Sequence, residues 1–370
     1  MYGDFSEKLA KLVVQYAVNV QKGDRVQLKG AANAEDLIRD IYREIIKAGG
    51  HTVKLDIGFS GFQEIFFKYA TEDQIKYVDE IGFEHVKKLT KAIFIFSSYN
   101  TRSLTNIDPK LLVMQRNAGK ELNEIFKKRA AAGEIDWNIC PYPNLAMAQE
   151  ASMGIEEYKE FVYKALALDK PDPVKFWNKM EANQNEIVKI LDKGKEIRII
   201  GEDTDLSLGI VGRKWINSCG HKNLPDGEVF TSPIEDSVNG TIRFTYPGIY
   251  MGREVENIWL KFKDGQVIDC NAAKGKDVLN NILELENAKI LGELAVGTNY
   301  GIQRFTKNML FDEKIGGTIH LALGSGFPEA GSKNKSPIHW DILKDMKSKD
   351  SKIILDGEEI YKAGKWLIPK

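Results

Sequence analysis

Cysteine and histidine are scarce in this chain of 370 residues. The three cysteines, Cys140, Cys219 and Cys270, are odd in number and lie far apart in the sequence. This pattern argues against a disulfide scaffold and against a four-cysteine zinc site, and it favours a reduced, cytoplasmic protein. Because there are only five histidines, any chemistry that needs imidazole has few positions available to it.

An excess of charge of one sign and long apolar runs are also lacking. The formal net charge of −1 argues against a basic surface for nucleic acid and against an acidic tail. No apolar run approaches the roughly 18 residues of a membrane helix. The N-terminal stretch, with Asp4 and Glu7, lacks the apolar core of a signal peptide. We therefore expect a cytoplasmic protein that binds neither membranes nor nucleic acid.

The composition that is present is that of an ordinary globular protein, and its length suggests two domains. In the first half, strand-like runs alternate with helix-like runs, which predicts a mostly parallel sheet flanked by helices. The strand-like runs are DRVQLKGA (24–31), HTVKLDIG (51–58), KAIFIFSSY (91–99) and IDWNICPYP (135–143), and the helix-like runs include residues 4–18, 34–50 and 109–133.

The pattern changes in the second half. Two helix-like runs cover residues 156–168 and 172–194, and many short strand-like runs follow, joined by turn signals such as Asn239-Gly240. This predicts an α+β domain rich in antiparallel strands. We therefore expect an N-terminal α/β domain over residues 1–185 and a C-terminal metal-binding catalytic domain over residues 186–370.

Several polar residues of the second half are embedded in apolar, strand-like surroundings. Glu228 precedes VFTSP, Glu293 lies in KILGELAVGTN, and His320 lies in GGTIHLALG. An ionised carboxylate in an apolar strand is costly unless opposite charge compensates it, and a divalent cation compensates several carboxylates at once. A metal site is therefore one explanation of this pattern.

His339 and Asp341 occupy a similar segment, SPIHWDIL. Because residues two apart in a strand face the same way, both side chains could bind one ion or two adjacent ions, while Trp340 faces the other side. Three carboxylates and two imidazoles suit zinc, cobalt or manganese. Five ligands exceed what one open catalytic ion takes, so two ions that share a carboxylate, roughly 3.5–4 Å apart, would use them better.

Each candidate also has a simpler interpretation. His320 alone is compatible with a hydrogen-bonded core histidine, Glu228 alone with a solvated turn position, and an H-x-D pair is by itself a weak signal. The long separations between the candidates mean that only the fold can bring them together. The glycine-rich GSGFPEAGS (324–332) lacks the ending of a phosphate-binding loop, and we interpret it as a flexible loop.

Longer segments resemble a known family. They are CPYPNLAMAQEASMGIEEYKEFV, GEDTDLSLGIVGRKW, NLPDGEVFTSPIEDSVNGTIRF and GELAVGTNYGIQRFTKNMLFDEKIGGTIHLALGSGFPEAGSKNKSPIHWDIL. In this order they are similar to the thermophilic metallo-aminopeptidases, the family of aminopeptidase T and aminopeptidase S, over nearly the whole chain. The resemblance implies an α/β domain followed by a catalytic domain, two divalent metal ions, most often zinc or cobalt, and a homodimer that encloses the active sites.

The resemblance also implies which residues bind the metals. In chain order, the family's ligands fall on Glu228, Glu293, Glu313, His320, His339 and Asp341. Glu293 would be the bridging ligand. One position departs from the family, which commonly has a tyrosine seven residues after the first histidine, where this chain has Phe327. A phenol can donate a hydrogen bond to an oxyanion and a phenyl ring cannot, so Tyr300 or a water would have to substitute.

The function expected from these features is removal of N-terminal residues from short peptides by metal-activated water, with Glu228 and Glu293 as catalytic residues. Two alternatives stay open. Two histidines and one aspartate, His320, His339 and Asp341, are also the ligand set of mononuclear non-haem iron oxygenases, and ring-cleaving dioxygenases resemble this family. A non-catalytic metal-binding relative, with Phe327 as the disabling change, is the other alternative.

Overall fold

The structure is a computed structural model that describes residues 3–368, with the side chains of residues 52 and 53 outside that description. The chain divides into two compact units. The first contains the described residues up to Trp177 together with Gly220–Pro225, and the second contains the remainder. Helix α10 (Pro173–Leu191) contributes residues to both units. The predicted boundary after residue 185 lies within this helix, and the division into 1–185 and 186–370 stays a prediction.

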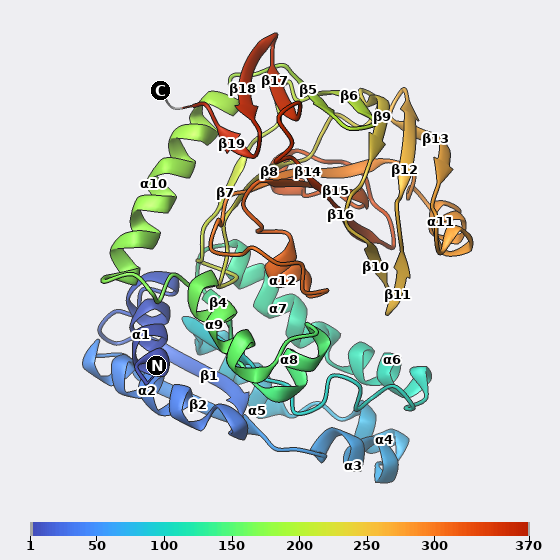
Figure 1. Ribbon diagram of the computed structural model, residues 1–370. Helices are drawn as coiled ribbons and strands as arrows, with labels where there is room; N and C mark the ends of the chain where they lie inside the picture. Colours follow the sequence, from blue (N-terminus) through green and yellow to red (C-terminus); the bar gives the residue numbers. More distant parts are fainter. Residues whose placement is uncertain (1–2, 369–370) are drawn as a thin grey trace. The chain divides into compact units, whose positions relative to one another are not determined.

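A parallel sheet of four strands, in the order β2-β1-β3-β4, forms the centre of the first unit (Figure 1). Its strands are β1 (Arg25–Ala31), β2 (His51–Gly58), β3 (Lys91–Phe96) and β4 (Asp136–Pro141). Each lies within one of the four strand-like runs of the sequence. The alternation of strands with helices therefore predicted this sheet correctly, because parallel strands need crossover connections, usually helical.

Helices flank this sheet (Figure 1). In α2, Leu37, Ile41 and Ile45 are fully buried at a spacing of four residues, which is the apolar stripe of an amphipathic helix. In chain order the helices are α1 (Phe5–Leu12) with the π-helical turn Val13–Ala17, the 3₁₀ turn Ala32–Ala34, α2 (Glu35–Lys47), α3 (Phe62–Tyr69), α4 (Glu72–Lys76), α5 (Glu80–Lys88), α6 (Pro109–Ala118), α7 (Lys120–Ala131), α8 (Leu145–Glu150) and α9 (Ile155–Ala165).

Two features of this unit differ from the sequence analysis. The run 109–133 forms two helices that meet at Gly119 rather than one. Helices α3 to α5 were not predicted, and each of them buries one residue, Phe67, Ile75 or Val86. All three helices are short, with 8, 5 and 9 residues, so each offers few positions in which a helical spacing of apolar residues can be recognised in the sequence.

Two antiparallel sheets dominate the second unit, together with a two-stranded ribbon of β10 and β11. The larger sheet has eight strands in the order β13-β12-β9-β6-β5-β17-β18-β19. The elements outside the smaller sheet are β5 (Glu196–Gly201), β6 (Thr204–Gly209), β9 (Asn239–Arg243), β10 (Gly248–Tyr250), β11 (Arg253–Val255), β12 (Trp259–Lys263), β13 (Gln266–Asn271), α11 (Lys276–Leu283), α12 (Met309–Asp312), the 3₁₀ turn Pro328–Ala330, β17 (Lys352–Leu355), β18 (Glu358–Lys362) and β19 (Lys365–Trp366). The prediction of an α+β domain rich in antiparallel strands is confirmed.

The smaller sheet has five antiparallel strands in the order β16-β15-β14-β8-β7. Its strands are β7 (Ile216–Ser218), β8 (Glu228–Thr231), β14 (Leu291–Gly297), β15 (Thr318–Gly324) and β16 (His339–Asp345). One face of β14, β15 and β16 carries Leu294, Val296, Leu321, Trp340 and Ile342, which are buried in the main core of the unit. Because successive side chains of a strand alternate between faces, the residues between these apolar ones point to the opposite face.

The described part of the chain, residues 3–368, contains no helix with both the length and the apolar character needed to cross a membrane.

Replacing Ile342 by alanine tests the core beneath this sheet. Ile342 is fully buried, so we expect the substitution to lower the free energy of unfolding by about 2–5 kcal/mol through the lost apolar contacts and the cavity. The matched control is Ile268→Ala in β13, whose side chain is exposed, and it should change the free energy of unfolding by at most ~0.5 kcal/mol. Denaturant unfolding measures both, and equal losses in the two variants would contradict this assignment of the core.

Candidate metal centre

Five of the six candidate ligands come from four neighbouring strands of the five-stranded sheet. They are Glu228 in β8, Glu293 in β14, His320 in β15, and His339 and Asp341 in β16. On β14, β15 and β16, these residues alternate with the apolar residues that face the core. The order of the strands in the sheet, which the sequence does not reveal, therefore places five distant polar residues on one face.

Small residues lie across the sheet from these side chains. Glu228 pairs with Gly297, and Ala322 lies between Glu293 and Asp341 in adjacent strands. Ala322 fills little of the space above the sheet, and the lack of a side chain at Gly297 allows the main chain at Lys314 and Ile315 to lie close against it. The pairing therefore leaves room for carboxylates and imidazoles to turn toward one another.

Glu228 is the first residue of β8 and is buried, which excludes the solvated turn position considered from the sequence. The preceding Gly227 has a φ of +123°, a backbone conformation that favours glycine. A Cβ at this position would lie 2.4 Å from the Met180 side chain and 3.0 Å from Asn299 Cβ. The turn that delivers Glu228 to the site therefore depends on this glycine.

Glu293 faces both histidines with different oxygens. Its Oε1 lies 3.7 Å from His320 Nε2, and its Oε2 lies 3.0 Å from His339 Nε2. The pairing of β14 with β15 shifts register between Leu291 and Glu293, and such irregularities often re-aim a side chain next to a functional site. Glu293 is therefore placed as a bridging ligand would be, between two groups.

His339 and Asp341 form the more accessible part of the centre. His339 Nε2 lies 3.4 Å from Asp341 Oδ1, and the His339 side chain is 31% exposed. Its other nitrogen, Nδ1, lies 2.7 Å from the carbonyl oxygen of Ser325. A histidine whose Nδ1–H donates to a backbone carbonyl presents a free Nε2 lone pair, which is the usual arrangement of a metal-binding imidazole.

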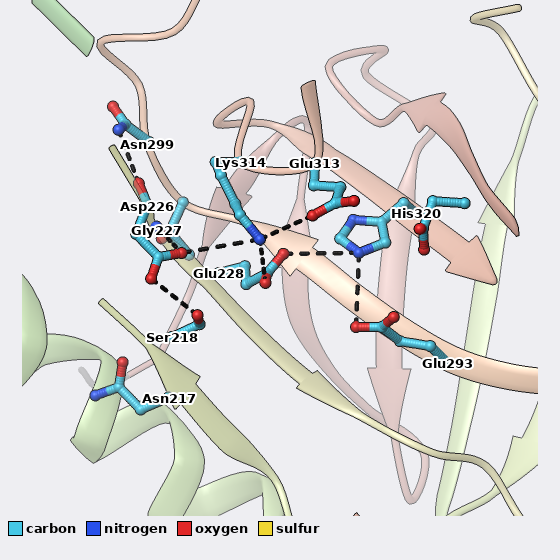
Figure 2. Close-up of polar contacts among 12 residues, drawn as sticks. Asn217, Ser218, Asp226, Gly227, Glu228, Glu293, Asn299, Glu313, Lys314 and His320 are labelled. Atoms are coloured by element: carbon cyan, nitrogen blue, oxygen red, sulfur yellow. Dashed lines mark hydrogen bonds and ion pairs between the residues drawn. The ribbon is translucent and has the colours of Figure 1, made fainter. Parts of the chain in front are cut away.

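His320 is buried between two carboxylates. Its Nε2 lies 3.6 Å from Glu228 Oε2 and 3.7 Å from Glu293 Oε1 (Figure 2). Its Nδ1 has no hydrogen-bond partner among the described residues. A core histidine held by hydrogen bonds to its surroundings would use this nitrogen, so the simpler interpretation of His320 fits poorly.

Glu313 reaches the centre from outside the sheet. It directly follows the short helix α12, whose first turn is capped by the side chain of Asn308. The side chain of Glu313 joins Glu228 and His320 in a compact group in which the ligand atoms lie within 4.8 Å of one another. The structure therefore brings Glu313, which the resemblance indicated as a ligand, together with two of the other candidate ligands.

The sequence analysis missed Lys314, the buried lysine at the middle of this group. Its ammonium donates to Glu228 Oε1, lies 3.0 Å from Glu313 Oε2 and lies 3.8 Å from Asp226 Oδ1 (Figure 2). In the sequence, Lys314 stands in FDEKIGG, which has the appearance of a charged turn at the surface. No local pattern distinguishes it from the many solvated lysines of the chain.

The pKa values of the centre respond to burial and to neighbouring charge. Burial raises the pKa of Glu228 to about 8, although Lys314 and His320 oppose this rise. Burial alone would also raise the pKa of Glu293, but the nearby imidazoles of His320 and His339 outweigh it and lower that pKa to about 2. Burial alone would lower the pKa of the two histidines. The neighbouring carboxylates outweigh this effect and raise the pKa of His320 to about 9 and that of His339 to about 11.

The residues form two groups of three that fit divalent cations. One group contains Glu228, Glu313 and His320, and the other contains Glu293, His339 and Asp341. Two buried carboxylate oxygens, Glu228 Oε2 and Asp341 Oδ1, have no hydrogen-bond partner among the described residues. Unpaired buried carboxylate oxygens beside imidazole nitrogens are the donor set that zinc, cobalt or manganese takes. A mononuclear iron site would need His320, His339 and Asp341 around one ion. In the structure His320 belongs to one group, and His339 and Asp341 belong to the other.

Phe327 lies beside the centre. Its ring centre is 5.1 Å from that of His339 and 4.9 Å from that of Phe230. The hydroxyl of Tyr300, considered as a substitute for a tyrosine at position 327, donates to the carbonyl of Gly364 at 2.8 Å. The Tyr300 hydroxyl is therefore already used as a donor, and Phe327 places an apolar ring beside the more accessible histidine.

Comparison with known proteins shows which family the chain resembles over its whole length. The chain is 28% identical to aminopeptidase AmpS of Bacillus subtilis, over 98% of this chain and 99% of that protein. It is 26% identical to aminopeptidase 2 of Geobacillus stearothermophilus, over 97% of each chain, and 23% identical to aminopeptidase T of Thermus thermophilus, over 98% of each. These relatives are aminopeptidases by name, as the resemblance predicts.

A solved structure and a family model agree with these relatives. The fold matches that of wild-type AmpT from Thermus thermophilus with a TM-score of 0.84 over the whole of both chains, at 21% identity. The family model described as thermophilic metalloprotease (M29) matches residues 4–366. The match covers nearly the whole sequence and confirms the predicted resemblance: the chain belongs to the M29 family of thermophilic metalloproteases.

Proposed function

We propose that the protein is an aminopeptidase that uses two divalent metal ions, zinc or cobalt with manganese as a further option, to remove N-terminal residues from short peptides. The observation that carries this proposal is the placement of Glu293, whose two carboxylate oxygens face the two histidines of separate ligand groups. A carboxylate in that position is suited to bridge two ions, and bridged pairs of ions are a recurrent arrangement in aminopeptidases.

The residues divide into ligands of two sites. Glu228, Glu313 and His320 would hold one ion, His339 and Asp341 would hold the other, and Glu293 would bind both. When bound, such ions supply Lewis acidity, which polarises a peptide carbonyl and lowers the pKa of water toward neutrality. The protein's own part is to fix these ligands by the rigid sheet, so that the site is formed before substrate arrives.

Glu313 is the better placed of two glutamates to move a proton to the leaving amine. Its side chain is 21% exposed, whereas that of Glu228 is 6% exposed. A group that carries a proton has to reach the substrate as well as its other partners, and the more exposed carboxylate has that access. In this assignment Glu228 and Glu293 act on the reaction by holding the ions.

The acidic character of the centre also suits the cleavage of residues from the N-terminus. A peptide with a free α-amine carries a positive charge at its N-terminus, and a carboxylate oxygen of Glu293 or Asp341, beside His339, would attract that group at short range as a hydrogen-bond acceptor. An internal peptide bond lacks such a charge nearby. The preference for peptides with free N-termini would follow from this attraction.

The proposal includes a cytoplasmic homodimer. The three cysteines are free, which suits a reducing compartment. The dimer rests on the resemblance to the family, and a chamber closed by two subunits would admit short peptides and exclude folded proteins.

Replacing Glu293 by glutamine tests the bridging role. The substitution keeps the size of the side chain but removes its charge, so we expect kcat/KM for aminoacyl-anilides and dipeptides to fall by roughly two orders of magnitude or more. The matched control is Glu284→Gln, on the exposed end of α11, which should keep full activity. Normal activity in Glu293→Gln, with an unchanged fold by circular dichroism, would rule out this role.

Removal of metal tests the dependence on ions. Dialysis against EDTA should abolish hydrolysis of peptides with free N-termini, and addition of zinc or cobalt should restore it. Peptides with acetylated N-termini should be poor substrates of the restored enzyme. A peptidase activity that survives complete removal of metal, shown by elemental analysis, would contradict the proposal.

Metal binding should release protons at pH 7. The pKa values of His320 and His339 are raised to about 9 and about 11, and that of Glu228 is raised to about 8, so both imidazoles and most of the Glu228 carboxyl are protonated at pH 7 in the metal-free protein. These groups must lose their protons to become ligands. We expect release of between two and three protons, and an affinity for zinc that rises with pH between 6 and 8. Calorimetric titration in buffers of different ionisation enthalpy measures the release, and a heat independent of the buffer would contradict the expectation.

A further inference from the structure

We infer that Lys314 is a built-in cation of the metal centre: it holds Glu228 and Glu313 by one oxygen each and makes the Glu228–Glu313–His320 group the weaker of two unequal metal sites. This inference rests on the proposed function, because it concerns the same ligands. It goes further in assigning a role to a residue that binds neither metal nor substrate, and in giving the order in which the two sites fill.

Among residues 3–368, the ion pairs of the Lys314 ammonium are all with carboxylates at the centre. The ammonium donates to Glu228 Oε1 and lies 3.0 Å from Glu313 Oε2, and the side chain is 2% exposed (Figure 2). The second oxygen of Glu228, Oε2, is turned toward His320 and has no hydrogen-bond partner among residues 3–368. Lys314 therefore occupies one oxygen of Glu228 and leaves the other for an ion.

The third carboxylate near Lys314 belongs to Asp226, which is itself held in place. Asp226 Oδ2 accepts a hydrogen bond from Ser218 Oγ at 2.9 Å, and Oδ1 accepts one from the N–H of Gly227 at 2.9 Å. The main chain of Lys314 is also fixed, since its carbonyl accepts from the N–H of Asn299 at 3.0 Å. The lysine is thus anchored at both ends, as a positioning residue has to be.

The formal charges of the centre balance only if Lys314 is counted. Five carboxylates meet here, and they are those of Asp226, Glu228, Glu293, Glu313 and Asp341. Two divalent ions would supply four positive charges, and the ammonium supplies the fifth, with both histidines neutral. Because unbalanced charge is costly to bury, this balance suits a centre with two ions and one lysine.

The two groups of ligands differ in their distance from this lysine. In the first group, Glu228 and Glu313 each form an ion pair with Lys314. An ion bound there would be attracted less strongly, because the ammonium already neutralises part of the charge of these carboxylates and repels the ion. In the second group, Glu293 and Asp341 pair with histidines, and neither forms an ion pair with a lysine or arginine within the described chain. The second group should therefore bind its ion first and more tightly.

Lys344 shows what a buried lysine with a purely structural role looks like in the same unit. Its ammonium donates to the carbonyls of Glu202 and Arg243, at 3.1 Å and 2.9 Å, rather than to carboxylates. It lies in β16, three positions from Asp341, and residues an odd number apart face opposite sides of a strand. Lys344 is therefore a matched control for the loss of a buried ammonium outside the metal centre.

The test is a titration of the metal-free, full-length protein with cobalt(II), followed by its visible absorption and by metal content after gel filtration. The wild type should bind two ions in two resolved steps whose dissociation constants differ at least tenfold. His320→Asn should remove the weaker step and keep the tighter one, whereas His339→Asn should remove the tighter one. Two ions of equal affinity, or the opposite assignment of the steps, would overturn the inference.

Lys314→Met then tests the lysine itself. Removing the ammonium should tighten the weaker step and reduce the ratio of the two dissociation constants at least fivefold, while Lys344→Met should leave the ratio within twofold of the wild type. An unchanged ratio in Lys314→Met would overturn the role of the lysine. If Lys314→Met does not fold, the two histidine variants still decide the order of filling.

The outcomes also separate this inference from the proposed function. Peptidase activity that depends on two ions of equal affinity would leave the proposed function intact and overturn the inference. A wild-type protein that binds no cobalt(II) would overturn both.

Discussion

The compensation of buried negative charge is the constraint on which this structure depends. Five carboxylates meet within one small region of the second unit, and several of them are shielded from water by the sheet beneath them. Carboxylates in such a place are costly unless cations are close by. Lys314 supplies one positive charge among these carboxylates. The carboxylates and the two histidines also form two groups whose geometry suits divalent ions.

The five-stranded sheet links this chemistry to the stability of the fold. One face of its central strands supplies apolar residues such as Leu321 and Trp340 to the main core, and the other face carries the candidate ligands. On that second face, Ala322 fills little space, and Gly297 allows the main chain at Ile315 to lie close against the sheet. The same strands that bury the core therefore fix the candidate ligands, and a site built on a sheet is held more rigidly than one built on loops.

Much of this arrangement could be predicted from the sequence because it depends on local sequence patterns. The parallel sheet follows from alternating strand-like and helix-like runs, and the shared face of His339 and Asp341 follows from the period of two in a strand. The order of strands in the sheet depends on contacts between distant segments. The apolar surroundings of Glu228, Glu293 and His320 could mark them as candidates for one metal site, and the family resemblance supported their convergence. Neither the local patterns nor the family resemblance identified Lys314, because its burial depends on the turn after α12 and on the folded position of Asp226.

The most direct test of the account is a crystal structure of the protein grown with zinc or cobalt and measured at the absorption edge of that metal. The account predicts two anomalous peaks, one among Glu228, Glu313 and His320 and one between His339 and Asp341, with Glu293 in contact with both. A fully loaded crystal in which the anomalous scatterers lie away from these six side chains would contradict it.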